Sequence, residues 1–242
     1  MTEGRAGEGR RLLDDAVARA RALGTAWVRH DAPARWGTPG ARDLRLEGAV
    51  DLRRRICVAG ESEVGPAAAL SAEPRRVVYA GGSRYIAGED GWEKVAGDVE
   101  GPRLADDPAW LLDALRYAVD CSVAPVDDGG TEVSCRLDLS GAEELDLSAL
   151  LPPARFAGRI GPARRRRREE SLRRVPCVVV LDAEGLIAWM AFGAPAADGV
   201  GMGWTTTEVV EYGVPVDLPD LMARSRPATW RGRKAHAAMP TR

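Results

Sequence analysis

The side chains able to carry out chemistry are few in this chain of 242 residues, and their spacing fits no catalytic motif. There are two histidines, His30 and His236, and only His30 has an adjacent acid, Asp31, with which it would form a base dyad. No serine or cysteine stands at a spacing that would complete this dyad as a nucleophilic site. We therefore interpret His30 as a structural or exposed residue, and the sequence indicates no enzyme and no cofactor.

The four cysteines, Cys57, Cys121, Cys135 and Cys177, form no CxxC pair and have no histidine at zinc-ligand spacing. No metal site is expected, and we predict reduced, partly buried thiols. If an export signal precedes the chain, disulfides become available again, with three ways of pairing. Cys135 falls on the apolar side of its expected strand, whereas Cys57 alternates with apolar residues and is predicted to be the more accessible thiol.

Two short motifs fall short of hydrolase and nucleotide-binding signatures. Ser83 lies in Gly-Gly-Ser-Arg-Tyr, where Tyr85 replaces the second glycine of a nucleophile elbow. The glycines of residues 199–203 lack the strand-turn-helix setting of a dinucleotide loop, and no Gly-Lys-Ser/Thr sequence is present. We interpret 199–203 as a flexible loop between strands.

Positive charge is concentrated in two segments and consists mostly of arginine. Of the formal net charge of -2, residues 163–174 contribute +5 and residues 223–242 contribute +6, so the rest of the chain carries -13. An arginine run can bind phosphates, but no aromatic residues interrupt it to stack on bases, so nucleic acid is not expected as a partner. A solvated surface is the simplest interpretation of the basic patch, which consists of Arg164, Arg165, Arg166, Arg167, Arg168, Arg173 and Arg174.

The N-terminal half of the chain reads as a helix followed by strands. Apolar residues at three-to-four spacing predict a helix over 10–23 that ends at Gly24, followed by a strand over 25–30. Residues 43–58 have apolar side chains at most even positions and charged side chains at most odd ones, which predicts one long strand with one buried face, and Gly48 within it marks a bulge or bend. Closely spaced turns then predict a meander of strands at 75–80, 83–87 and 92–95.

The second half contains a helix and then further strands. Asp107 as N-cap and Pro108 at the first helical position predict a helix over 107–119. A strand at 131–139, a helix at 141–150, a hairpin made of 177–181 and 186–192, and a last strand at 205–212 follow. Helices and strands do not alternate regularly, so the expected class is α+β: one strongly curved antiparallel sheet, a half-barrel, with helices packed on its concave side. We expect a disordered N-terminus at 1–9, a single domain at 10–222 and a basic, disordered tail at 223–242.

The order of these elements resembles the LolA/LolB-like lipoprotein-carrier fold, in its actinobacterial LppX/LprG-like form. The resemblance is carried by the helix before the strand at 44–58, by Val-Tyr-Ala-Gly-Gly-Ser-Arg-Tyr at 78–85 with Gly-Trp at 91–92, and by the helix at 108–117. It continues through Val-Val-Leu-Asp-Ala-Glu-Gly-Leu at 179–186 and Thr-Thr-Thr-Glu-Val-Val-Glu-Tyr-Gly-Val-Pro-Val at 205–216. The resemblance implies a half-barrel whose apolar cavity holds acyl chains under a helical lid, with no catalytic residues. Members of that family carry a signal peptide and a lipobox cysteine, and neither occurs in this sequence.

Two functions follow from these observations. The first is a non-enzymatic binding protein for a lipid or similar hydrophobic ligand; aromatic residues make up only 5% of the chain, so its lining would be aliphatic. The candidate lining consists of Leu44, Leu46, Val50, Leu52, Ile56, Val58, Trp110, Leu111, Val133, Leu137, Val179 and Leu181. The second is an interaction module with a filled core, which docks through its arginine-rich segments onto an acidic protein or an anionic membrane surface.

The start of the chain has no apolar signal region, and no run of about 18 apolar residues occurs in it. The sequence as written is therefore expected to be cytoplasmic. If a signal precedes the written start, the expected location is the cell envelope.

Overall fold

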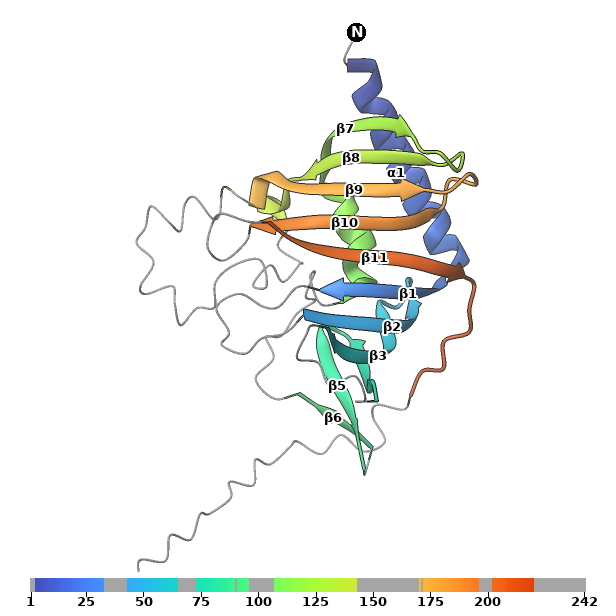
Figure 1. Cartoon of the computed structure of the whole chain (residues 1–242), viewed down its shortest axis with the longest axis vertical. Helices are drawn as coiled ribbons and strands as arrows, with labels where there is room; N and C mark the ends of the chain where they lie inside the picture. Colours follow the sequence, from blue (N-terminus) through green and yellow to red (C-terminus); the bar gives the residue numbers. More distant parts are fainter. Residues whose placement is uncertain are drawn as a thin grey trace, which may run out of the picture.

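A computed structural model describes residues 3–32, 43–64, 73–89, 91–95, 107–142, 170, 172–195 and 202–219. Within these residues, eleven strands form one antiparallel sheet in the order β6-β5-β4-β3-β2-β1-β11-β10-β9-β8-β7 (Figure 1). Their bounds are β1 Thr25–Ala32, β2 Asp43–Asp51, β3 Ile56–Val64, β4 Arg75–Ala80, β5 Ser83–Gly88, β6 Gly91–Lys94, β7 Ala118–Pro125, β8 Thr131–Leu137, β9 Val175–Leu181, β10 Ile187–Pro195 and β11 Met202–Tyr212.

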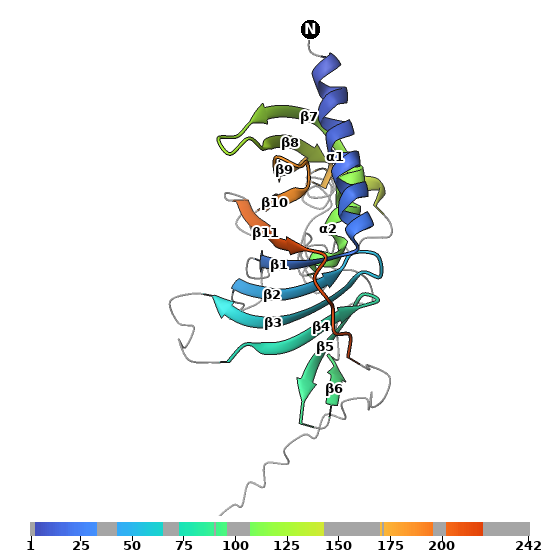
Figure 2. The same ribbon diagram turned by 90° about the vertical axis from the view of Figure 1, so that its right-hand side faces the viewer.

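The sheet consists of two meanders, β1 to β6 and β7 to β11, which join where β1 pairs with β11. The helices α1 (Glu3–Leu23) and α2 (Leu111–Ala114) lie on the same side of the sheet, within its bend (Figure 2). This arrangement confirms the predicted α+β half-barrel. Because both meanders bury residues against the same helices, most of the core forms between the inner face and this helical layer.

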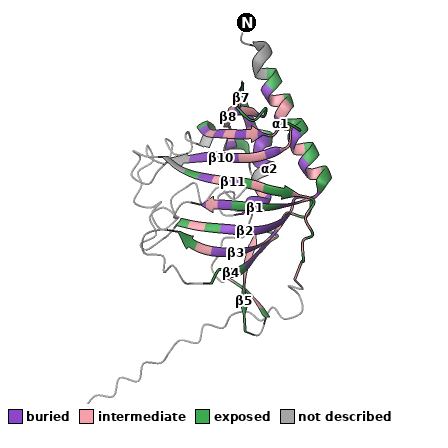
Figure 3. Ribbon diagram, turned by 45° about the vertical axis from the view of Figure 1, so that its right-hand side comes forward, coloured by how far each residue is buried: buried purple, intermediate pink, exposed green. Residues whose placement is uncertain are grey.

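α1 covers the β7 end of the sheet. Its buried residues Leu13, Ala16 and Ala20 recur at helical spacing and face the sheet, while its outer side is exposed (Figure 3). Gly24 has a φ of +87°, the conformation that favours glycine, and its N–H donates to the Ala20 carbonyl at 3.1 Å. The helix ends where the sequence predicts, but it begins seven residues earlier than residue 10.

The expected helix at 107–119 is replaced by three short helical pieces, and its last two residues belong to a strand. Two short 3-10 helices, η1 (Pro108–Trp110) and η2 (Leu115–Tyr117), flank α2, and β7 begins at Ala118. Val119 in β7 is paired with Arg136 in β8, so pairing with a distant strand overrides the local helical pattern. The expected helix at 141–150 lies outside the described residues from 143 onward, and only the 3-10 helix η3 (Leu139–Gly141) is seen before it.

The single long strand predicted at 43–58 is also wrong, because the chain turns back at residues 52–55 to form the β2–β3 hairpin. The Asp51 carboxylate accepts hydrogen bonds from the N–H groups of Arg53 (3.0 Å) and Arg54 (2.7 Å), which holds this turn. Since Asp51 is then opposite Ile56, and Val50 is opposite Cys57, the inward-facing positions change from even to odd numbers. Ile56 therefore lies on the face opposite to Val50.

Gly48 lies in the middle of β2, and the pairing of β2 with β1 and β3 runs through it without a shift, so no bulge forms there. A Cβ at this position would come within 2.2 Å of the Val58 carbonyl oxygen and 2.5 Å of the Ala59 Cα. Glycine is required because the backbones of β2 and β3 approach each other on this side.

Candidate functional site

The predicted lining residues fall into four groups. Seven of them are buried together in the core on the inner face: Leu46, Val50, Leu52, Val133, Leu137, Val179 and Leu181. Leu44 and Trp110 are half-buried, and the Leu111 side chain lies outside the described part. Ile56 and Val58 are half-buried on the opposite face, because Val58 is paired with Ala49 rather than with an inward-facing residue. The structure therefore brings most of the predicted residues together in one aliphatic surface. That this surface lines a cavity stays a prediction.

The cover over this surface is the helical segment 108–117 together with α1. Ala109, Leu112, Ala114 and Leu115 are buried against the core, and Trp110 packs partly against it. Because these residues come from three short helical pieces rather than one continuous helix, tertiary packing provides most of the segment's stability.

One buried carboxylate ties this cover to its neighbours. Asp113 is only 4% exposed and accepts hydrogen bonds from Arg21 of α1 at 2.8 Å and from Arg55 of the β2–β3 turn at 2.9 and 3.0 Å. The Arg55 guanidinium also lies over the Trp110 ring, 4.4 Å from its centroid. Both arginines are half-exposed at their outer ends, so the buried charge of Asp113 is compensated without burying two cations completely.

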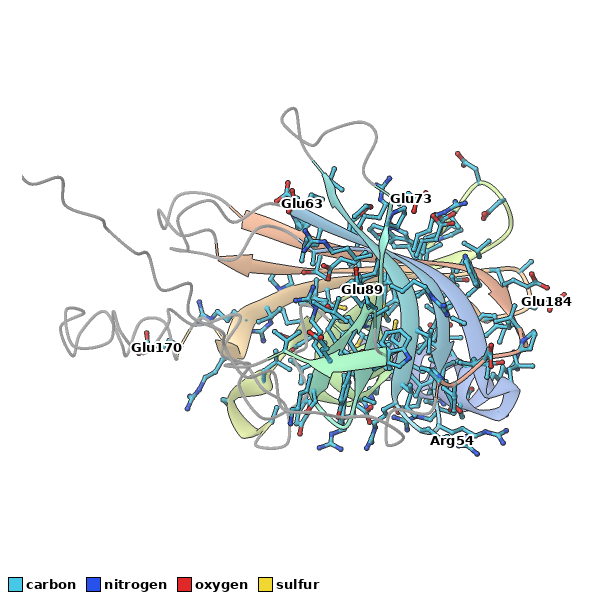
Figure 4. The ribbon with its side chains drawn as sticks, turned by 90° about the horizontal axis from the view of Figure 1, so that it is seen from below. Arg54, Glu63, Glu73, Glu89, Glu170 and Glu184 are labelled. Atoms are coloured by element: carbon cyan, nitrogen blue, oxygen red, sulfur yellow. The ribbon has the colours of Figure 1, made fainter. Side chains whose placement is uncertain are left out.

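The three consecutive arginines of the β2–β3 turn have different roles. Arg53 donates to the carbonyl oxygens of Arg21 and Ala22 at the C-terminal end of α1, which satisfies acceptors that the helix leaves open. Arg55 binds Asp113, as described above. Arg54 points away from the molecule and is 68% exposed (Figure 4). The turn is therefore an anchoring point for both α1 and the helical segment.

A second buried acid lies where the helical segment begins. Asp107 is 2% exposed, and its carboxylate accepts the N–H of Ala109 at 3.0 Å, so it is the N-cap that the sequence predicts. Burial raises the pKa of Asp107 to about 7, and the Ala109 hydrogen bond opposes this rise. Burial, and then the nearby Asp107, raises the pKa of the Cys57 thiol well above its usual range. Cys57 is completely buried, so the prediction that it is the accessible thiol is wrong.

Polar groups continue along the inner face of β3 and β4. Glu61 is 6% exposed and forms an ion pair with Arg84, and the Tyr79 hydroxyl donates to its Oε2 at 3.5 Å. Burial raises the pKa of Tyr79, whereas the charge of Arg84 opposes this effect. The Arg84 Nε is buried and has no hydrogen-bond partner among the described residues. This end of the inner face therefore contains the Glu61 carboxylate, the Tyr79 hydroxyl and the Arg84 Nε, an N–H donor without a hydrogen-bond partner among the described residues.

His30 and Asp31 do not form a dyad, because adjacent residues of a strand face opposite sides of the sheet. His30 is completely buried, and its Nδ1 lies 2.8 Å from the Thr207 hydroxyl oxygen. Asp31 lies on the outer face and binds Arg45 with contacts of 2.7 and 2.9 Å. The interpretation of His30 as a structural residue agrees with these contacts.

The remaining predicted features lie away from the inner face. Arg173 and Arg174 are exposed in the 3-10 helix η5 (Leu172–Arg174), and residues 164–168 lie outside the described residues. Across the described ranges, no three His, Cys, Asp or Glu side chains are placed to hold a metal ion. In the same ranges, no helix is long and apolar enough to cross a membrane.

Comparison with known proteins gives similarity at the level of structure. Neither a protein-family model nor a curated protein sequence matches the chain. The lipoprotein LppX of Mycobacterium tuberculosis superposes with a TM-score of 0.52 at 10% identity, covering 88% of this chain and 99% of LppX. LprF of Mycobacterium bovis superposes with a TM-score of 0.46 at 13% identity, covering 89% of this chain and 98% of LprF. The resemblance that the sequence indicates is thus confirmed for the fold, and this chain has the curved-sheet fold of the lipoprotein LppX.

Proposed function

We propose that the protein is a non-enzymatic carrier that binds acyl chains between the inner face of its sheet and its helical cover. The observation that carries this proposal is the aliphatic surface formed by residues of both meanders under α1 and residues 108–117. The fold shared with LppX supports it by analogy, since a fold by itself does not fix a function.

The composition of this surface favours acyl chains over ring-shaped ligands. Among the described residues, the fully buried core contains only two aromatic side chains, Tyr79 and Phe192, and leucine, valine and alanine dominate. An alkyl chain bound to an aliphatic surface gains about 0.8 kcal/mol for each CH₂ removed from water.

The polar end of the inner face suits the head of an anionic amphiphile. The buried Arg84 Nε without a partner would donate to a carboxylate or phosphate oxygen, which would form a charge-assisted hydrogen bond. Glu61 already compensates the charge of Arg84, so the ligand would share this guanidinium with Glu61 rather than replace it. The proposed ligand is therefore a fatty acid or a lipid with an acidic head.

Titration of the purified protein with a fluorescent long-chain fatty acid tests this proposal. Leu46→Phe places extra volume on the inner face, and Val58→Phe places the same group on the opposite face of the neighbouring strand. We expect Leu46→Phe to weaken binding at least tenfold and Val58→Phe to change it less than twofold. Thermal unfolding of both variants shows whether each remains folded under the conditions of the titration.

Native mass spectrometry and organic extraction of the purified protein complete this test. A co-purifying lipid that is lost on extraction is expected. The proposal is rejected if no lipid co-purifies and the wild-type protein takes up no fluorescent fatty acid, or if both phenylalanine variants weaken binding equally.

A further inference from the structure

Three of the four cysteines form a row across the strands β7, β8 and β9, away from the proposed ligand's polar end. Cys135 in β8 lies directly opposite Cys177 in β9. Directly opposed residues of antiparallel strands have Cα atoms about 4.5–5.5 Å apart, which is within the range that a disulfide spans. Both side chains are buried, so the two sulfur atoms face each other inside the protein rather than in solvent.

A local irregularity brings the third thiol to the same place. The pairing of β7 with β8 shifts between Val119 and Ser122, and Asp120 has a φ of +54°, as expected for a bulge. Cys121 follows Asp120, and its thiol is close enough to Cys135 to influence the pKa of Cys135. Cys135 therefore has a neighbouring thiol on each side, Cys121 on one and Cys177 on the other.

The contacts among the three thiols shift their pKa values in different directions. Hydrogen bonding by Cys177 lowers the pKa of Cys135, and Cys121 and the nearby Arg10 add to this effect against the opposing influence of burial. The hydrogen bond with Cys135 and burial raise the pKa of Cys177, and burial raises the pKa of Cys121 to about 11. Because Cys135 lies between the other two cysteines and its pKa is the one that is lowered, it is assigned as the attacking nucleophile of the row.

α1 controls access to the row. A Cβ on Gly9 would lie 2.8 Å from the Cys121 Cβ, so the absence of a side chain lets the helix backbone approach this cysteine. Arg10 then donates to the carbonyl oxygens of Arg116 (2.8 Å) and Ala118 (3.0 Å), which fixes the helix at the start of β7. For an oxidant to reach the thiols from this side, this part of α1 would have to move away.

We propose that Cys135 and Cys177 are a reversible thiol–disulfide site, oxidised by a small-molecule disulfide of the glutathione class. The Cys135 thiolate attacks one sulfur of the oxidant, forming a mixed disulfide and releasing one glutathione thiolate. Cys177 gives its proton to that thiolate and attacks the Cys135 sulfur, which releases the second glutathione as a thiolate. This thiolate takes up from solvent a proton equivalent to the one that Cys135 lost. Two protein thiols become one disulfide while one oxidised glutathione becomes two reduced molecules.

The row is better suited to this reaction than to a metal. Among the described residues, no three potential ligands are placed around one point, which agrees with three sulfur atoms in a line across the strands. The disulfide would join β8 to β9 two residue pairs from their ends at Leu137 and Val175. These ends delimit the stretch of chain that contains the arginine run, so oxidation would fix both ends of that stretch.

Thiol counting in a glutathione redox buffer tests the proposal. The protein is incubated with oxidised glutathione both as the native protein and through one cycle of unfolding and refolding, and free thiols are then labelled under denaturing conditions. We expect the count to fall from four to two, with peptide mapping that links Cys135 to Cys177. Closing this long loop should also raise the Tm by about 5–10 °C.

Two single variants and one matched pair sharpen this result. Cys57→Ser should still lose two thiols, whereas Cys135→Ser should keep all three. Gly9→Ala should speed oxidation of the native protein severalfold, and Gly7→Ala should not, because a Cβ there meets nothing within 4 Å. Four free thiols after both treatments, a link from Cys135 to any other cysteine, or loss of two thiols from Cys135→Ser would overturn the proposal.

Discussion

Asp107 and Asp138 each cap a 3-10 helix, in two different regions of the molecule, but their pKa values shift in opposite directions. Each precedes a 3-10 helix and accepts a hydrogen bond from the N–H two residues further on, Ala109 at 3.0 Å and Ser140 at 3.1 Å. Hydrogen bonds from Ser140 lower the pKa of the solvated Asp138, whereas burial raises that of Asp107 to about 7. The comparison shows that a capping motif can be recognised in a sequence while its charge depends on what packs over it.

Two closely packed glycines, Gly48 and Gly9, also differ in the atoms that they contact. In β2, which contacts the 3-10 helix η1 after Asp107, the missing side chain of Gly48 accommodates backbone atoms of β3, whereas Gly9 of α1 accommodates the Cys121 side chain of β7. A side chain can move aside, but a paired backbone cannot without breaking the ladder. The contact at Gly48 is therefore the more rigid of the two.

The largest expected effect follows from filling the contact at Gly48. Gly48→Ala places a Cβ 2.2 Å from the Val58 carbonyl oxygen, so we expect it to lower the free energy of unfolding by about 4 kcal/mol or more. Gly9→Ala should cost only about 1 kcal/mol, because the Cys121 side chain can shift. Urea denaturation of both variants measures this difference, and equal losses would show that the two regions are packed alike.

The next effect is the pH dependence that Asp107 causes. In the unfolded chain this carboxyl ionises near its usual 3.8, whereas in the folded protein it keeps its proton up to about 7. Between these pH values the folded state binds more protons, so its contribution to stability falls as pH rises, by up to about 4 kcal/mol.

Asp107→Asn keeps a side-chain oxygen that can accept the Ala109 hydrogen bond and removes the ionisable group. We expect the variant to be as stable as wild type at pH 4 and more stable at pH 8. Urea denaturation from pH 4 to pH 8 checks this. Parallel pH profiles of the two proteins would mean that Asp107 is ionised throughout and that burial does not control it.

The sequence predicted the half-barrel and the Asp107 cap because alternation and capping are local signals. It missed the turn at 52–55, because the alternation on either side was extended across Arg54, a charged residue at an apolar position, and no glycine or proline marks the turn. That one turn exchanged the positions of Cys57 and Val58 between the two faces. The available signs of the turn were Asp51, which can accept hydrogen bonds from the following N–H groups, and the interruption of the alternation at Arg54.

The buried acids were missed for a different reason. The partners of Asp113 lie 58 and 92 residues away in sequence, at Arg55 and Arg21, so nothing near Asp113 indicates an ion pair. Glu61 shares the inward position of Cys57 and Ala59, and this becomes apparent only once the preceding turn is placed. The cysteine row is likewise invisible without the register of β7, β8 and β9, since the expected helix at 107–119 covered the start of β7.

The smallest expected effect belongs to Asp138 and completes the comparison. Its pKa is lowered in the folded state, so it stabilises the protein above pH 4, and this contribution is lost as pH falls through its folded pKa. Asp138→Asn keeps an acceptor for Ser140, so we expect a change within about 0.5 kcal/mol at pH 7. The difference in the free energy of unfolding between Asp138→Asn and wild type should change with pH in the opposite direction to that for Asp107→Asn. This change should be confined to acid conditions. Urea denaturation between pH 2 and pH 5 measures it; a slope of the same sign would mean that packing over residues 138–140 removes this carboxylate from solvent as well.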